Sequence, residues 1–93
     1  MSNEEESPIF RFNNLISNMK PLDKHITESN GLHIELIGTF DNGICMQLFD
    51  TKYQIEVQLT NVIACSRCCN CVRFFDAKNT DLIITYEVFS NLF

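Results

Sequence analysis

The sequence predicts an all-β fold, a small five-stranded barrel with a short N-terminal helix. Two observations carry this prediction. Apolar and polar residues alternate through three successive segments between positions 32 and 59, which is the period of half-buried strands. Short turn sequences separate the segments, and Gly38 lies inside the first of them. A glycine within a strand indicates a bulge or a sharp bend, which a small barrel needs in order to close.

Length and composition favour one folded domain. The chain has 93 residues, of which 45% are hydrophobic, and this excludes a disordered chain. We expect residues 1–8 to form an acidic flexible tail closed by Pro8, and residues 9–93 to form the domain. The formal net charge is −5, and the sequence has no basic stripe of the kind that holds a phosphate backbone.

The sequence also bears on location. No apolar run approaches the roughly 20 residues that span a bilayer, and the acidic N-terminus does not resemble a signal peptide. We therefore expect an intracellular protein that does not contact a membrane. Its five cysteines are then expected to be reduced.

The individual elements follow from local patterns. The helical spacing of Phe12, Leu15, Ile16 and Met19 predicts one or two turns of helix, which Pro21 ends. Residues 22–30 are ambiguous. Strands are predicted at 32–40, 44–49 and 53–59, and Asp41-Asn42-Gly43 is a strong hairpin signal between the first two. Residues 60–70 are expected to be irregular, and two more strands are predicted at 71–75 and 82–89.

A three-strand meander followed by a hairpin matches the oligonucleotide/oligosaccharide-binding (OB) barrel. The alternative is a small open sheet with a helix packed on one face. The two architectures differ in whether the sheet closes on itself, and the alternation pattern alone is compatible with both.

One stretch resembles a known family. The run from Val72 to Thr80, followed by the apolar strand to Phe89, is similar to the closing hairpin of the replication protein A small subunit, a family of single OB barrels. Residues 34–40 resemble the first strand of that family, and the likeness covers about 60 residues. The small subunit of the telomeric CST complex has the same design. The cysteine cluster at 65–71 is not part of the pattern.

The resemblance implies a function. It implies a non-catalytic, nuclear subunit of a single-stranded-DNA-binding complex that serves replication, repair or telomere maintenance. Its partners would be larger OB-fold subunits, and it would contact single-stranded DNA indirectly. Family members continue from the last strand into a C-terminal helix that packs against partner subunits. In this chain the helix would begin near Ser90, as its N-cap, with Leu92 and Phe93 as its first apolar positions.

The phenylalanines indicate a protein interface. Eight phenylalanines exceed what the interior of so small a barrel needs. Phe74 and Phe75 are adjacent, so one of them must point away from the core if both lie in a strand. We expect a partner-binding surface, because exposed apolar clusters usually mark interfaces. Its residues would be Phe74, Phe75, Phe89, Leu92 and Phe93. The alternative is that the N-terminal helix covers them.

Direct binding of nucleic acid is expected to be weak or absent. OB barrels bind strands of nucleic acid on the outward face of their second and third strands, where aromatic side chains stack on bases. Here that face offers Phe49 as its only aromatic residue and Lys52 as the only nearby cation, and Glu56 repels phosphate. Arg73 and Lys78 on the later hairpin could add contacts.

The cysteine cluster allows a different class of function. Cys65, Cys68, Cys69 and Cys71 place four thiols within seven residues, and thiolates are good ligands for zinc. A zinc finger needs a second pair at a distance, and the sequence has none. The main alternative is that alternate cysteines are small apolar residues at the start of a strand. A redox or disulfide role is a third reading.

No motif for catalysis is visible, and we do not expect an enzyme. No cofactor is expected, apart from the zinc that the cysteines could hold. Two alternatives to the DNA-complex subunit stay open. One is a small zinc- or thiol-binding module, and the other is an OB-fold adaptor in a complex unrelated to DNA.

Overall fold

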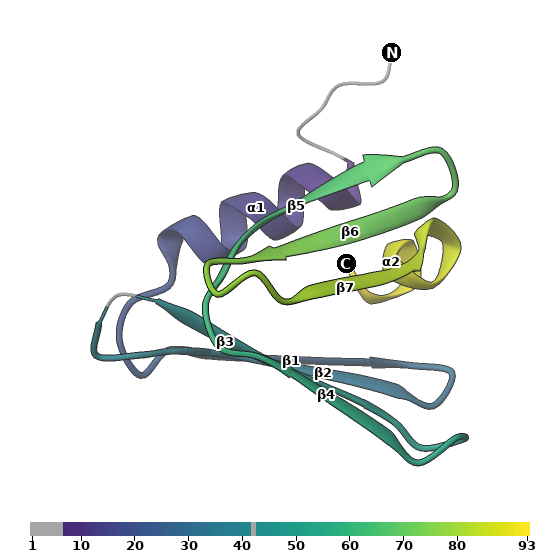
Figure 1. The fold of residues 1–93 in the computed structure, drawn as a ribbon, viewed down its shortest axis with the longest axis horizontal. Coiled ribbons are helices and arrows are strands. Elements are labelled where there is room, and N and C mark those ends of the chain that lie inside the picture. The colour runs from purple at the N-terminus through teal and green to yellow at the C-terminus, as the bar shows by residue number, and fades with distance from the viewer. Residues whose placement is uncertain (1–6, 42) are drawn as a thin grey trace.

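The fold is mostly β-structure, arranged as two antiparallel sheets with two short helices (Figure 1). A computed structural model describes residues 7–41 and 43–93. The acidic tail predicted for residues 1–8 therefore lies almost entirely outside the described residues. Pro8, expected to close that tail, is instead the first residue of a helix.

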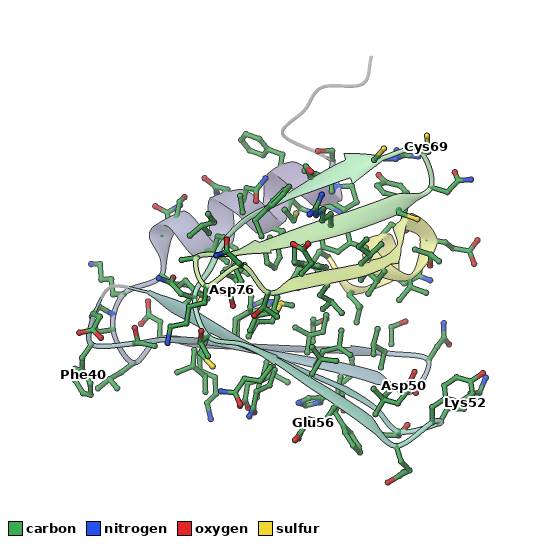
Figure 2. The ribbon with its side chains drawn as sticks, viewed as in Figure 1. Phe40, Asp50, Lys52, Glu56, Cys69 and Asp76 are labelled. Carbon is green, nitrogen blue, oxygen red and sulfur yellow. The ribbon has the colours of Figure 1, made fainter. Side chains whose placement is uncertain are left out.

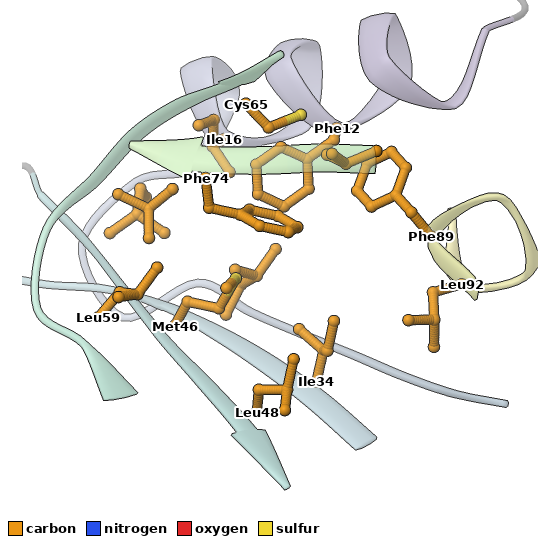
Figure 3. Close-up of a cluster of buried hydrophobic side chains, with 14 residues drawn as sticks. Phe12, Ile16, Ile34, Met46, Leu48, Leu59, Cys65, Phe74, Phe89 and Leu92 are labelled. Carbon is orange, nitrogen blue, oxygen red and sulfur yellow. The ribbon is translucent and has the colours of Figure 1, made fainter. Parts of the chain in front are cut away.

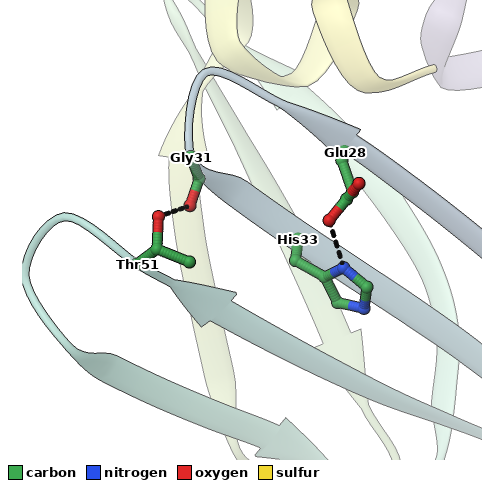
Figure 4. A network of polar contacts seen from close by, with 4 residues as sticks. All are labelled: Glu28, Gly31, His33 and Thr51. Atoms are coloured by element: carbon green, nitrogen blue, oxygen red, sulfur yellow. Dashed lines mark hydrogen bonds and ion pairs between the residues drawn. The ribbon is translucent and has the colours of Figure 1, made fainter.

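The first sheet is a meander of four neighbouring strands. They are β1 (Lys24–Ser29), β2 (Leu32–Gly38), β3 (Ile44–Asp50) and β4 (Ile55–Leu59). Asn30 and Gly31 connect β1 to β2, and both have positive φ, 49° and 84°, as a tight primed hairpin turn requires. The Thr51 side chain, in the turn between β3 and β4, donates to the Gly31 carbonyl at 2.9 Å, which ties these two turns together (Figure 4).

The second sheet has three strands, β5 (Val62–Cys68), β6 (Cys71–Asp76) and β7 (Asp81–Thr85). The register of β5 against β6 shifts between Val62 and Ala64, which marks a β-bulge. Beyond β7 the chain continues directly into helix α2 (Tyr86–Leu92). The Thr85 side chain caps this helix by accepting a hydrogen bond from the Val88 N–H at 3.3 Å.

Helix α1 (Pro8–Asn18) runs along β5 and closes one side of the molecule (Figure 1). Ser7 caps its start by accepting from the Phe10 N–H at 3.0 Å, and Pro8 fits the first helical turn because its missing donor would be unpaired there. Its buried face carries Phe12 and Ile16. Because it extends from Pro8 to Asn18, the helix is longer than the one or two turns that the sequence predicts.

The hydrophobic core lies between the two sheets and is completed by both helices (Figure 3). Its centre is aromatic. The Phe12 ring meets the Phe74 ring edge-on at 5.2 Å and the Phe89 ring at 5.8 Å, distances typical of favourable aromatic pairs. From the four-stranded sheet the core receives the alternate residues Ile34, Leu36, Ile44, Met46, Leu48 and Leu59.

Four of the five predicted strands are confirmed as β2, β3, β4 and β6, and the fifth is confirmed in part as β7. Two strands of the structure, β1 and β5, were not predicted. The described part of the chain contains seven strands in two sheets, and the pairing of those strands forms no closed barrel, so the five-stranded barrel is not confirmed. Residues 24–29, which fit no pattern, form β1. Residues 60–70, expected to be irregular, contain β5. The predicted strand at 82–89 is wrong beyond Thr85, because Thr85 caps a helix there, and Ser90 lies inside that helix.

Gly38 has a different role from the predicted bulge. Its pairing with Ile44 continues the regular register between β2 and β3. A Cβ at this position would lie 2.1 Å from the Lys20 carbonyl oxygen. The glycine is required because the connection between α1 and β1 crosses here in direct backbone contact.

Candidate functional site

The predicted partner-binding phenylalanines divide between the core and the surface. Phe74 and Phe89 are fully buried, and Leu92 is buried beside them. The prediction that these three offer an exposed apolar surface is wrong, because all three belong to the core, where the Phe12 ring of α1 packs against Phe74 and Phe89. Phe93 is half-buried, with its ring 5.0 Å from the Phe12 ring. Phe75 is half-buried and belongs to the opposite side of β6, as expected for a neighbour of Phe74.

An apolar surface does exist, on the outer side of the three-stranded sheet. Ile83 is 59% exposed and pairs across the sheet with Arg73. Ile63 is 61% exposed and precedes Ala64, the cross-strand partner of Phe75. We call these four residues, Ile63, Phe75, Arg73 and Ile83, the Ile83 face.

Arg73 lies in the middle of the Ile83 face and is fixed from two sides. Its Nη2 donates to Asp81 Oδ2 at 2.7 Å, and its guanidinium carbon lies 5.3 Å from the centre of the Phe75 ring. The hydrogen bond and the charge of Asp81 raise the pKa of Arg73. The guanidinium is thus paired within the chain, and its flat surface adds to the contact area of the face.

The outer side of the four-stranded sheet is polar and rich in carboxylates. Two polar side-chain pairs lie on it: His33 Nδ1 lies 3.0 Å from Glu28 Oε2 (Figure 4), and Lys24 Nζ lies 3.8 Å from Glu35 Oε2. Phe49 lies on this side between its cross-strand partners His33 and Glu56. A single aromatic platform bounded by carboxylates fits a nucleic-acid backbone poorly.

The four residues proposed for weak nucleic-acid contacts are not brought together. Phe49 and Lys52 belong to the end of the four-stranded sheet, where Figure 2 shows Lys52 beside Asp50. Lys78 lies in the turn that follows Asp76, and Figure 2 shows Asp76 far from Lys52. Arg73 is on the second sheet and is paired with Asp81. No continuous basic track forms from these side chains.

The fold separates Cys65 from the other three clustered cysteines. Cys65 points into the core and is 3% exposed, and burial raises the pKa of its thiol to about 12. Cys68, Cys69 and Cys71 are exposed at the hairpin between β5 and β6. The described residues contain no group of three His, Cys, Asp or Glu side chains that could hold a metal ion. The set Cys65, Cys68, Cys69 and Cys71 therefore does not form one metal site in this fold.

A groove that the sequence did not indicate runs between α1 and β1. It has a volume of about 550 Å³ and is bordered by Phe10, Leu15, Ile26 and Phe93, among others. Arg11 closes part of it by donating from Nε to the Phe93 carbonyl at 2.6 Å. The exposed Phe10 could have signalled the groove, but its wall β1 has no clear strand pattern. Ile63 was missed similarly, because the bulge in β5 disrupts the alternation that would assign its face.

Comparison with known proteins gives no relatives: no family model, no curated protein and no solved structure matches this chain. Within residues 7–41 and 43–93, no helix is long and apolar enough to cross a membrane.

Proposed function

We propose that this chain is a non-catalytic binding subunit that works through protein–protein contacts, and that the Ile83 face is its contact surface. The observation that carries the proposal is the exposure of Ile63 and Ile83 around the fixed Arg73. Fully burying an isoleucine side chain contributes about 1.5–3 kcal/mol. Aromatic residues and arginine are also enriched at the centres of interfaces.

The partner that fits this surface is another folded protein with an apolar patch of its own. Arg73 is already paired with Asp81, so the face presents little uncompensated charge to a partner. A strongly charged partner such as a nucleic-acid backbone would gain little there. The outer side of the four-stranded sheet is also a poor site for a nucleic-acid backbone, because carboxylates lie around Phe49.

The connection with single-stranded DNA rests on the resemblance at residues 72–80. In support, the matching hairpin of β6 and β7 is followed at once by a helix, as in the replication protein A small subunits. The proposal is therefore a nuclear subunit that holds a larger OB-fold protein and contacts DNA through it. The closed five-stranded OB barrel, which the sequence predicts, is also part of this proposal.

Co-expression with candidate large subunits of single-stranded-DNA-binding complexes, followed by size-exclusion chromatography, tests the proposal. The wild-type chain should elute with one of them, and Ile63→Ser with Ile83→Ser should weaken the complex at least tenfold. Ile26→Ser is the matched control, because Ile26 is similarly exposed but lies on the four-stranded sheet. Equal weakening by the control would show that the Ile83 face is not the contact surface.

DNA binding is measured separately, by fluorescence anisotropy with a labelled single-stranded oligonucleotide. The chain alone should give no saturable signal at physiological salt, whereas its complex should bind. An adaptor unrelated to DNA is the second candidate, favoured by the acidic net charge of −5. It would be supported if the Ile83 face captures a partner and the complex does not bind the oligonucleotide.

A further inference from the structure

The hairpin between β5 and β6 carries two thiols at directly opposed positions. Cys68 and Cys71 are paired across the two strands, and only Cys69 and Asn70 lie between them. Both cysteines are exposed and free. Directly opposed residues of antiparallel strands point to the same side of the sheet with Cα atoms about 4.5–5.5 Å apart. This spacing lies within the roughly 4.4–6.8 Å that disulfides span.

The turn that joins the two thiols is anchored to the rest of the molecule. Arg67 Nε donates to the Cys69 carbonyl at 2.9 Å, and the Tyr86 N–H donates to the Asn70 carbonyl at 2.6 Å. The Arg67 guanidinium also lies 3.5 Å above the centre of the Tyr86 ring. Asn70 is thus tied directly to the start of α2, and Cys69 is tied to it through Arg67, so these contacts limit how far the turn can open.

Cys69 is held away from such a bond. Its φ of 58° lies in the left-handed region, as a residue within a tight turn requires. It is adjacent in sequence to Cys68, and neighbouring Cα atoms are about 3.8 Å apart, which is below the usual span of a disulfide. The geometry therefore favours the directly opposed pair of Cys68 with Cys71 over a bond between Cys68 and Cys69.

We propose that Cys68 and Cys71 form a reversible dithiol–disulfide site that exchanges with small disulfides such as oxidised glutathione. One of the two thiolates attacks a sulfur of glutathione disulfide, forms a mixed disulfide and releases one glutathione thiolate. The second cysteine then attacks the protein sulfur of the mixed disulfide, forms the Cys68–Cys71 bond and releases the second glutathione. The protein loses two protons and two electrons, and the glutathione disulfide is reduced to two thiols.

This site is distinct from the zinc site considered from the sequence. A structural zinc ion needs about four ligands. Here only two thiols converge, and Cys65 is buried on the inner side of β5. The inference goes beyond the proposed function, since it concerns the hairpin end and does not depend on which partner the Ile83 face binds.

The test equilibrates the full chain, fully reduced at the start, in buffers of graded reduced-to-oxidised glutathione ratio. After acid quenching and alkylation of the unfolded chain, intact mass should show a species that carries three alkyl groups in place of five, because two of the five thiols are joined. Before alkylation this species should lie two hydrogen masses below the reduced chain. The tryptic peptide of residues 68–73 contains all three exposed thiols. Its fragmentation should place the alkyl group on Cys69 and the internal bond between the other two cysteines.

Matched variants decide the outcome. Cys69→Ser should form the internal bond with a midpoint ratio within about threefold of wild type. Cys68→Ser and Cys71→Ser should lose it and stop at a mixed glutathione disulfide, with unchanged thermal unfolding as proof of folding. The proposal is overturned if Cys69→Ser takes up two glutathiones without forming the bond, or if the bond in wild type includes Cys69. Neither result would bear on partner capture by the Ile83 face.

Discussion

The side chain of Asn13 on α1 hydrogen-bonds both backbone groups of Cys65 on β5. Its Nδ2 donates to the Cys65 carbonyl at 3.1 Å, and its Oδ1 accepts from the Cys65 N–H at 2.9 Å. β5 is an edge strand of the three-stranded sheet, so these groups have no neighbouring strand. The amide takes the place of such a strand and blocks pairing with another chain at this point.

Replacing Asn13 by Asp should destabilise the fold by roughly 1–3 kcal/mol. A carboxylate can still accept from the Cys65 N–H, but its second oxygen would face the Cys65 carbonyl and could not donate. Urea unfolding monitored by circular dichroism measures the change. Asn14→Ala is the control, because Asn14 is exposed on the same helix, and its effect should stay below about 0.5 kcal/mol. Equal losses for both variants would show that the bond to β5 contributes nothing specific.

The contrast between β3 and β5 shows how far sequence alone can predict this fold. In β3 the residues Ile44, Met46 and Leu48 alternate with more polar ones, so pairing and face could be predicted, and the structure buries all three. In β5 the bulge between Val62 and Ala64 shifts the register, so no single period describes the strand. The local alternation of apolar and polar residues cannot predict such a shift, because the shift depends on contacts with β6 and α1.

The phenylalanines show a second limit. Adjacent positions show that Phe74 and Phe75 face opposite sides of a strand, and this prediction is confirmed. Which side is covered depends on where α1 packs, and that is decided by residues far away in sequence. Thr27 is similar: it takes an inward position in β1 because its hydroxyl donates to the Leu92 carbonyl at 2.8 Å. A polar residue in that position removes the alternation by which the strand could have been recognised.

Gly38→Ala should be strongly destabilising, by about 3 kcal/mol or more. The new methyl carbon would overlap the Lys20 carbonyl oxygen at 2.1 Å. The two backbone segments cannot easily move apart, because the Gly38 N–H donates to the Asp23 carbonyl at 2.8 Å. Thermal unfolding checks this expectation. Gly43→Ala is a suitable control, because its nearest neighbour would be the Asn61 side chain at 3.0 Å, which can rotate away. A melting temperature unchanged by Gly38→Ala would disprove the close crossing.

Phe89→Ala and Phe75→Ala should separate the core from the binding surface. Removing the buried Phe89 ring should cost about 3–5 kcal/mol of unfolding free energy, because its aromatic contacts with Phe12 and Phe74 are lost. Phe75→Ala should cost less than half as much, yet weaken partner capture. Chemical unfolding and co-elution are measured on the same preparations. If Phe89→Ala left stability intact, the aromatic centre would not be where the structure places it.

The buried thiol of Cys65 predicts a specific loss of stability at alkaline pH. Burial raises its pKa from 9.0 to about 12, so the folded state keeps the proton while the unfolded state gives it up. The contribution is therefore complete below about pH 9, and it declines as the pH rises toward 12 by at most about 1.4 kcal/mol for each pH unit. Cys65→Ala removes this thiol and should flatten the curve of unfolding free energy against pH over that window.

Alkaline pH acts on the whole protein, so the informative quantity is the difference in unfolding free energy between wild type and variant. The exposed Cys68→Ser variant provides the reference, and its curve should run parallel to that of wild type. Unfolding by urea at half-unit pH steps, with a reductant present throughout, gives the three curves. If Cys65→Ala declined as steeply as the other two proteins, the side chain of Cys65 would be accessible to water, and the seam between α1 and β5 would be open.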